Sequence, residues 1–215
     1  MEYLAQFIDL VLHLEKHLAV LIQNYGGWVY LILFLIIFCE TGLVVMPFLP
    51  GDSLLFVAGT MAAVGAMDVH GLFALLVVAA FSGDNTNYWI GHFIGPRVFK
   101  RARSRLFNPA HLHKTQRFYE KHGGKTVILA RFMPVVRTFA PFVAGIGRMR
   151  YRNFLFYSFS GSVLWIGFFV YAGYYFGNIP FVKNNLTAFI LGIIVISILP
   201  ALISFVREKF GKRSR

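Results

Sequence analysis

The sequence predicts an all-α, polytopic membrane protein with two opposed re-entrant helical hairpins, about three full transmembrane helices and an inverted repeat. Composition, charge distribution and the positions of prolines lead to this prediction. The chain has 215 residues and is 57% hydrophobic but only 14% charged, with a mean hydropathy of +0.63. Soluble domains are roughly 45–50% apolar and about a quarter charged. The chain therefore carries too few charged groups to cover a surface exposed to water.

The net charge of +12 is segregated along the chain. Residues 1–16 contain one basic and three acidic residues, and residues 17–96 contain four acids and no Lys or Arg. Residues 97–215 contain twenty basic residues and two acids. Membrane proteins that follow the positive-inside rule show this pattern, whereas a nucleic-acid-binding protein carries its basic stripe on a soluble fold. The expected partner is the bilayer, with no nucleic acid.

Enzyme motifs are absent from the sequence. It contains no phosphate-binding or dinucleotide-binding glycine loop, no set of zinc ligands and no G-x-S-x-G nucleophile motif. His111 and His113 lie in a basic linker. We therefore expect no enzymatic activity, no cofactor and no metal, and the sequence leaves the oligomeric state open.

Three segments are apolar enough to cross a bilayer, which requires about 20 such residues per helix. We predict these spans at 71–95, 154–177 and 186–206. Asp84 is the only formal charge in the first span. The other two lie within stretches that contain no charged side chain.

Three further segments are polar or basic. Residues 1–24 carry polar side chains at spacings of three and four, which predicts an amphipathic helix. This helix either lies at the interface or turns its polar face into a bundle. Residues 97–124 are predicted to form a basic cytoplasmic loop with a short helix, and residues 207–215 a basic cytoplasmic tail. The loop either binds anionic lipid heads or only sets the topology.

Residues 125–148 are predicted to form a re-entrant hairpin. The segment has basic flanks on both sides, so it enters and leaves the membrane on one face. It is too short to cross twice, and Pro134 and Pro141 are expected to break helices. Backbone of this kind persists at membrane depth only where it is buried in protein or lines a cavity. Gly145 completes the predicted break.

Residues 28–67 are predicted to form a second hairpin, entering from the opposite face because neither flank carries a nearby Lys or Arg. Pro47, Pro50 and Gly51 would form its turn. The two halves share a weak repeat, since Trp-Ile-Gly occurs at 89–91 and again at 165–167. Opposed halves with broken helices are typical of secondary transporters. Spaced glycines in both copies indicate close helix packing.

Four charged residues lie beside the helix-breaking prolines: Glu40, Asp52, Arg131 and Arg137. A charge at the bilayer centre costs about 2.5–3.5 kcal/mol on insertion scales. If the hairpin tips meet, two acids would face two arginines. This cluster either fixes the fold as a set of ion pairs or forms a site in which arginines hold an anion and an acid carries a proton.

Individual roles follow from chemistry. Arg131 and Arg137 suit a phosphate, which guanidinium groups bind with two hydrogen bonds. Glu40 and Asp52 are candidates for proton coupling, and Asp84 is a second-rank candidate. Asp52 has an alternative role as a helix cap. The alternative for Asp84 is a polar packing contact with its neighbours Asn85 or Asn87.

At these residues the sequence resembles the DedA family. The segment from Glu40-Thr-Gly through Phe48-Leu-Pro-Gly-Asp52-Ser-Leu-Leu is similar to the family's first motif. Arg131-Phe-Met-Pro134-Val-Val-Arg137-Thr-Phe-Ala-Pro141 is similar to the second. The resemblance implies a multi-pass protein of the bacterial inner membrane that carries undecaprenyl phosphate or another phospholipid. It also implies a role in envelope integrity, and places the family's essential acids and arginines on these four charged residues.

These observations support one main hypothesis and two alternatives. The main hypothesis is a flippase that moves an anionic polyprenyl phosphate or phospholipid, driven by the proton motive force, with protons and the lipid as partners. The first alternative is a proton-coupled antiporter of small cations or drugs, in which the arginines have only a structural role. The second alternative is a membrane scaffold that transports nothing.

Overall fold

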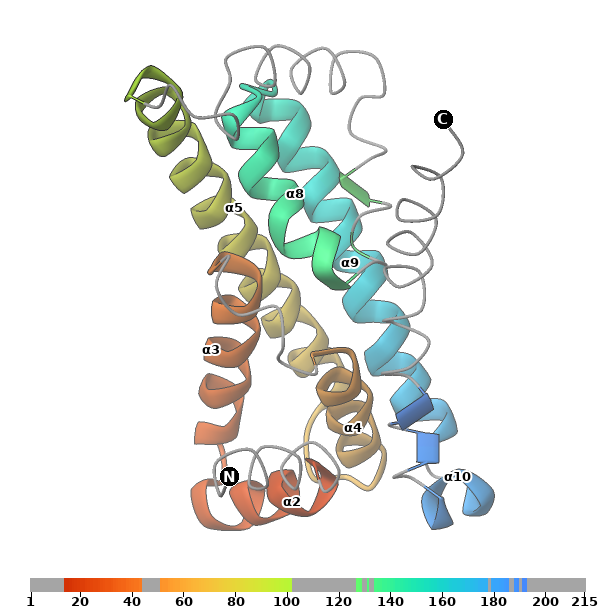
Figure 1. Cartoon of the computed structure of the whole chain (residues 1–215). Coiled ribbons are helices and arrows are strands. Elements are labelled where there is room, and N and C mark those ends of the chain that lie inside the picture. Colours follow the sequence, from red (N-terminus) through yellow and green to blue (C-terminus); the bar gives the residue numbers. More distant parts are fainter. Residues whose placement is uncertain are drawn as a thin grey trace, which may run out of the picture. The chain divides into compact units, whose positions relative to one another are not determined.

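The computed structural model describes residues 14–43, 51–101, 127–128, 131, 134–177, 179–185, 188–189 and 191–192. Within these residues the fold is helical and contains no strand, which confirms the predicted all-α class. The helices are labelled in Figure 1. They are α2 (Leu14–Tyr25), α3 (Trp28–Gly42), α4 (Gly51–Ala63), α5 (Val69–Arg101), α8 (Pro134–Ile146), α9 (Tyr151–Phe176) and α10 (Pro180–Asn184).

Among the described residues, two helices are long and apolar enough to cross a membrane, at Val69–Ile94 and Tyr151–Phe176. They correspond to the spans predicted at 71–95 and 154–177. Asp68 caps the N-terminus of α5, because its carboxylate accepts a hydrogen bond from the backbone N–H of Gly71. Most of the third predicted span, 186–206, lies outside the described residues.

The predicted hairpin arms appear as shorter helices. α3, α4 and α8 are apolar and have 15, 13 and 13 residues. At a rise of about 1.5 Å per residue, each is shorter than the roughly 30 Å hydrocarbon core. Residues 44–50, with Pro47 and Pro50, lie outside the described part, as do 129–130 and 132–133. The re-entrant turns therefore stay predictions.

Pro141 differs from our expectation. It lies inside α8, which begins at Pro134 and continues to Ile146, so the helix is not broken at Pro141. Pro134 occupies the first position of the helix, where the missing N–H costs nothing. Gly145 lies within α8 as well, and Gly51 is the buried first residue of α4. Of these residues, only Pro134 and Gly51 mark a helix end.

α4 and α8 end in the same way. After α4 the N–H of Ala66 donates to the carbonyl of Met61, and Gly65 adopts a φ of 81°. After α8 the N–H of Met149 donates to the carbonyl of Ala144. Both are Schellman caps, in which the residue after the helix takes a left-handed conformation. In the second cap this residue is Arg148, at φ 50°, a conformation that usually requires glycine.

The chain divides into two compact units. The first unit comprises Met1–Leu35, Phe48–Leu76 and Trp165–Arg215. The second comprises Ile36–Pro47 and Val77–Leu164. The unit boundaries fall inside α3, α5 and α9, so each of these helices contributes residues to both units.

In the first unit, α4 packs against the C-terminal half of α9 through glycines. A Cβ atom on Gly59 would collide with the carbonyl oxygen of Val170 in α9. A Cβ atom on Gly173 in α9 would in turn collide with the carbonyl oxygen of Phe56. Because the obstructing atoms are backbone, the two helices come this close only where neither carries a side chain. α2 also contacts α4.

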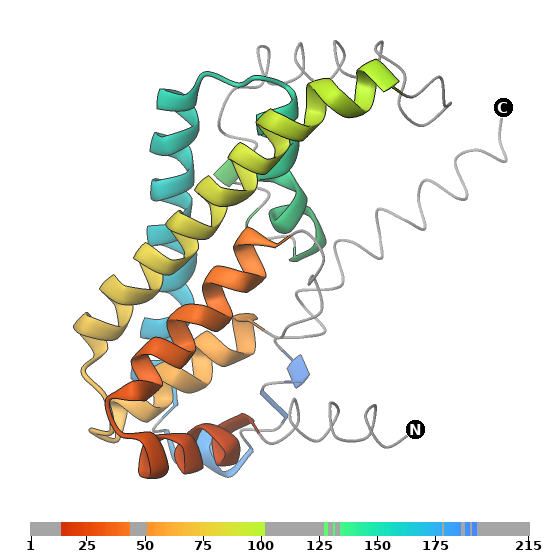
Figure 2. The same cartoon turned by 90° about the vertical axis from the view of Figure 1, so that its left-hand side faces the viewer.

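In the second unit, α8 packs against the C-terminal half of α5 through the same kind of contact (Figures 1 and 2). A Cβ atom on Gly91 of α5 would collide with the carbonyl oxygen of Phe142. One on Gly145 of α8 would collide with the carbonyl oxygen of Tyr88. Each unit therefore contains one short helix that crosses a long helix at two glycines.

The two crossings share one register. The equivalent positions are Phe56 with Phe142, Gly59 with Gly145, and Gly173 with Gly91. The separation is 86 residues between α4 and α8 and 82 residues between α5 and α9. The structure thus matches Gly91 with Gly173 and not with Gly167 of the second Trp-Ile-Gly. The matching contacts support an internal repeat, and its inverted orientation stays a prediction.

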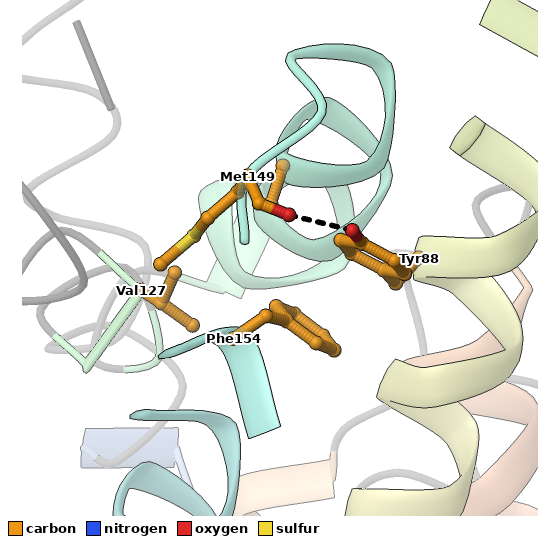
Figure 3. Packing of buried hydrophobic residues seen from close by; sticks show 5 residues of the cluster. Tyr88, Val127, Met149 and Phe154 are labelled. Carbon is orange, nitrogen blue, oxygen red and sulfur yellow. Dashed lines mark hydrogen bonds between the residues drawn. The ribbon is translucent and has the colours of Figure 1, made fainter. Parts of the chain in front are cut away.

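An aromatic cluster holds the second unit together below the α8 cap (Figure 3). The rings of Tyr88 and Phe154 stack with centroids 4.4 Å apart, and Val127 packs beside them. Tyr88 also donates a hydrogen bond to the carbonyl of Met149 at 2.7 Å, shown as the dashed line. This bond joins α5 to the segment between α8 and α9, and so fixes where α8 ends.

Candidate functional site

Two buried ion pairs lie in the second unit. The first joins Glu40, near the end of α3, to Arg137 in α8 through Oε1 and Nη2. Glu40 is 1% exposed and Arg137 is 7% exposed. We expected acids of the first predicted hairpin to face arginines of the second only if the hairpin tips meet; the structure brings one such acid, Glu40, into contact with one such arginine, Arg137. A charged pair so well removed from water must be compensated locally.

The second ion pair joins Arg131 to Asp84 of α5, through Nη2 and Oδ2. Ser158 of α9 bridges the two groups, because its hydroxyl donates to Asp84 Oδ2 at 2.7 Å and accepts from Arg131 Nη2 at 3.3 Å. All three side chains are buried. Asp84 thus binds Arg131 and Ser158, and not the asparagines that we considered as its packing partners.

Asn87 connects the backbones on which the first pair is built. Its Nδ2 donates to the carbonyls of Thr41 at 3.1 Å and Thr138 at 2.7 Å. These two residues follow Glu40 and Arg137 in the sequence, so one amide of α5 holds α3 and α8 at the ion pair. The Oδ1 of Asn87 is buried and has no hydrogen-bond partner within the described residues. It can accept a hydrogen bond from a water or a ligand.

Asp52 belongs to the first unit, while Glu40, Arg131 and Arg137 belong to the second. It lies in the first turn of α4 and accepts a hydrogen bond from the indole Nε1 of Trp165 at 2.9 Å. Its position agrees with the helix-terminal role that we considered, because acids stabilise the start of a helix; its role in proton coupling stays a prediction.

The sequence alone does not identify Trp165, Ser158 or Gly161 as site residues. The indole of Trp165 is fully buried, and its partner is 113 residues away in the sequence. Ser158 and Gly161 lie three residues apart on α9, and small residues at this spacing indicate a face that packs closely. That pattern was the available signal, but it does not identify a charged partner.

The contact between Asp52 and Trp165 gives a first testable prediction. Trp165→Phe should lower the free energy of unfolding in detergent by about 1.5–3 kcal/mol, because it removes the hydrogen bond that the indole donates to the Asp52 carboxylate. Trp28→Phe is the matched control, since Trp28 is 68% exposed and should change stability by less than about 0.5 kcal/mol. Denaturant unfolding followed by circular dichroism measures both, and equal losses would contradict the assignment.

The described residues thus combine two helices long and apolar enough to cross a membrane with two buried ion pairs. The sequence model of the VTT domain family matches residues 49–175 of this chain. The chain is 56% identical to the Protein DedA of Escherichia coli K12 over 211 residues, which cover 97% of this chain and 96% of that protein. The chain belongs to the DedA family of membrane proteins.

More distant relatives are membrane proteins too. An uncharacterized membrane protein of Mycobacterium tuberculosis H37Rv is 44% identical over 182 residues, which cover 84% of this chain and 80% of the relative. The inner membrane protein YqjA of Escherichia coli K12 is 33% identical over 196 residues, covering 87% and 88%. No solved structure matches the chain.

Proposed function

We propose that this protein is a multi-pass lipid transporter of the bacterial inner membrane. It moves an anionic polyprenyl phosphate, such as undecaprenyl phosphate, or an anionic phospholipid across the bilayer, and the proton motive force drives the movement. Family membership supports a membrane role. The observation that carries the proposal is the pair of buried arginines, Arg131 and Arg137, each bound to a carboxylate in one unit.

Each arginine has the chemistry to exchange its carboxylate for a lipid phosphate. A guanidinium group binds carboxylates and phosphates in the same planar geometry, so the two anions compete for it. In the structure, Glu40 binds Arg137 and Asp84 binds Arg131. When a carboxylate takes up a proton it ceases to compete, and the phosphate occupies its place. The lipid tail remains in the hydrocarbon.

This exchange couples the lipid to protons. Glu40 and Asp84 are the acids in direct contact with the arginines, while Asp52 acts from the first unit. One charge moving through 100 mV supplies about 2.3 kcal/mol. A phosphate held between arginines crosses without the full cost of a bare anion in hydrocarbon.

Lipid translocation in proteoliposomes with an imposed proton gradient tests the proposal. Arg131→Ala and Arg137→Ala should reduce the initial rate to the level of empty liposomes, because the phosphate loses its ligand. Arg137→Lys should retain little activity, since an ammonium group does not form the two parallel hydrogen bonds. Wild-type rates in both alanine variants would contradict the mechanism.

The alternative, a proton-coupled antiporter of small cations or drugs, is favoured by one observation. Both arginines already bind carboxylates, which is the structural role that an antiporter gives them. An antiporter would tolerate lysine at 131 and 137 better than a phosphate carrier. Ion flux in matched vesicles, without lipid movement, would favour this alternative.

A further inference from the structure

We propose that Asp84, Ser158 and Arg131 form a second proton-exchange site beside the pair of Glu40 and Arg137, so that two protons enter for each polyprenyl phosphate dianion bound. The two sites act on each other, because Arg137 also interacts electrostatically with Asp84 and Arg131. This inference rests on the proposed function and specifies its stoichiometry. It starts from the finding that the two arginines of the second unit contact different acids.

The position of Arg131 is set by α9. A Cβ atom on Gly161 would lie 2.7 Å from Cδ and 2.8 Å from Nε of Arg131, so the arginine stem lies directly against the α9 backbone. Ser158, one turn earlier on α9, contacts the end of the same guanidinium. The stem and the head of Arg131 thus both rest on α9, and Asp84 approaches the head from α5.

Ser158 allows Asp84 to keep a hydrogen bond when it gives up Arg131. A hydroxyl is both a donor and an acceptor. With Asp84 ionised, Ser158 donates to Oδ2. With a proton on Oδ2, the carboxyl group donates to Ser158 Oγ instead, and the hydroxyl hydrogen rotates away. The acid therefore stays hydrogen-bonded after the guanidinium has left.

The charges balance with two protons. Two arginines and two carboxylates are neutral together, and so are two arginines and one phosphate monoester dianion. Each proton binds a carboxylate oxygen and breaks one ion pair, and no bond to carbon or phosphorus changes. Counted over these four side chains and the phosphate, a single proton would leave one excess negative charge, which is costly away from water.

The experiment measures how the affinity for farnesyl phosphate, a short polyprenyl monophosphate, depends on pH. Purified full-length protein in detergent is titrated between about pH 7 and 9, where the phosphate is a dianion because its second ionisation lies near pH 6. For each proton taken up on binding, the affinity falls about tenfold when the pH rises by one unit. The affinity of the wild type should therefore fall about a hundredfold per pH unit.

Variants assign the two protons. Asp84→Asn and Glu40→Gln should each reduce the dependence to about tenfold per pH unit, because one titrating acid has been removed. Ser162→Ala is the matched control, since Ser162 is buried one turn after Ser158 and its hydroxyl donates to a backbone carbonyl. It should keep the wild-type slope. A wild-type slope in Asp84→Asn would overturn the inference.

Infrared spectroscopy tests the site without ligand. Acidifying the wild-type protein should produce a carbonyl band of a protonated carboxyl group that is absent in Asp84→Asn. Ser158→Ala, which keeps the ion pair, should shift the frequency of this band, because the acid loses its hydrogen bond. An unchanged band in both variants would overturn the inference even if the lipid is transported. Failure of the wild type to bind farnesyl phosphate would instead count against the proposed function.

Discussion

Arg137→Met should lower the free energy of unfolding by about 3–5 kcal/mol, because it leaves Glu40 buried without the cation that compensates its charge. Glu40 is 1% exposed and accepts a hydrogen bond from Arg137, so water cannot replace the lost partner. Chemical unfolding in detergent, followed by circular dichroism, measures the loss. A loss below about 1 kcal/mol would be the value of a solvent-exposed pair, and would contradict the buried geometry.

The double variant Glu40→Leu with Arg137→Met is the matched control. Replacing a buried ion pair by apolar residues of similar volume is often neutral or stabilising. Its free energy of unfolding should therefore return to the wild-type value or exceed it. Lipid translocation should nevertheless be absent, because the phosphate ligand is gone.

This double variant separates a transporter from a scaffold. If the charges only fix the fold, a stable apolar pair should retain the biological activity, and so should the charge-swapped pair Glu40→Arg with Arg137→Glu. If Arg137 binds a phosphate from α8, both variants are inactive although they are folded. An active and stable apolar double variant would therefore eliminate the proposed exchange.

Gly91→Ala and Gly173→Ala should each lower the free energy of unfolding by about 1–3 kcal/mol. In both cases the added Cβ atom meets a backbone carbonyl oxygen, of Phe142 or Phe56. A backbone atom cannot rotate away, so the two helices must separate. The two losses should be similar, because the crossings share the same register.

Gly27→Ala is the control for this pair of variants. Gly27 has no atom within 4 Å of the position that a Cβ would occupy. Alanine there should change the stability by less than about 0.5 kcal/mol. A loss at Gly91 but not at Gly173, measured by thermal unfolding in one detergent, would contradict the equivalence of the two units.

The long spans and the buried charges were predictable from the sequence. The lengths of the apolar segments predict α5 and α9. A chain with so few charged residues suits a bilayer better than water. Glu40 and Arg137 were candidate site residues because each lies near a proline in an apolar segment, and the structure supplies the finding that they form a pair. These inferences depend on local properties of the chain. They succeed where the free energy of placing a segment or a charge in the bilayer decides where it lies.

The partner of Arg131 and the continuity of α8 depend on tertiary contacts. Spacing does not reveal which acid reaches Arg131, because Asp84 and Ser158 come from different helices. Pro141 was expected to break a helix, yet helices in membranes tolerate proline where neighbouring groups satisfy the freed backbone. The repeated Trp-Ile-Gly does not identify which glycines occupy equivalent contacts, because Gly91 makes the contact that Gly173 makes in the other unit.

The packing of α4 against α9, and of α8 against α5, has a consequence for synthesis. Asp52 of α4 meets Trp165 of α9 113 residues later, whereas Asn87 meets Thr138 after only 51. At about 5–20 residues per second, α4 waits several seconds for the helix that covers its glycine face. A ribosome that stalls before α9 therefore leaves the glycine face of α4 without the helix that packs against it.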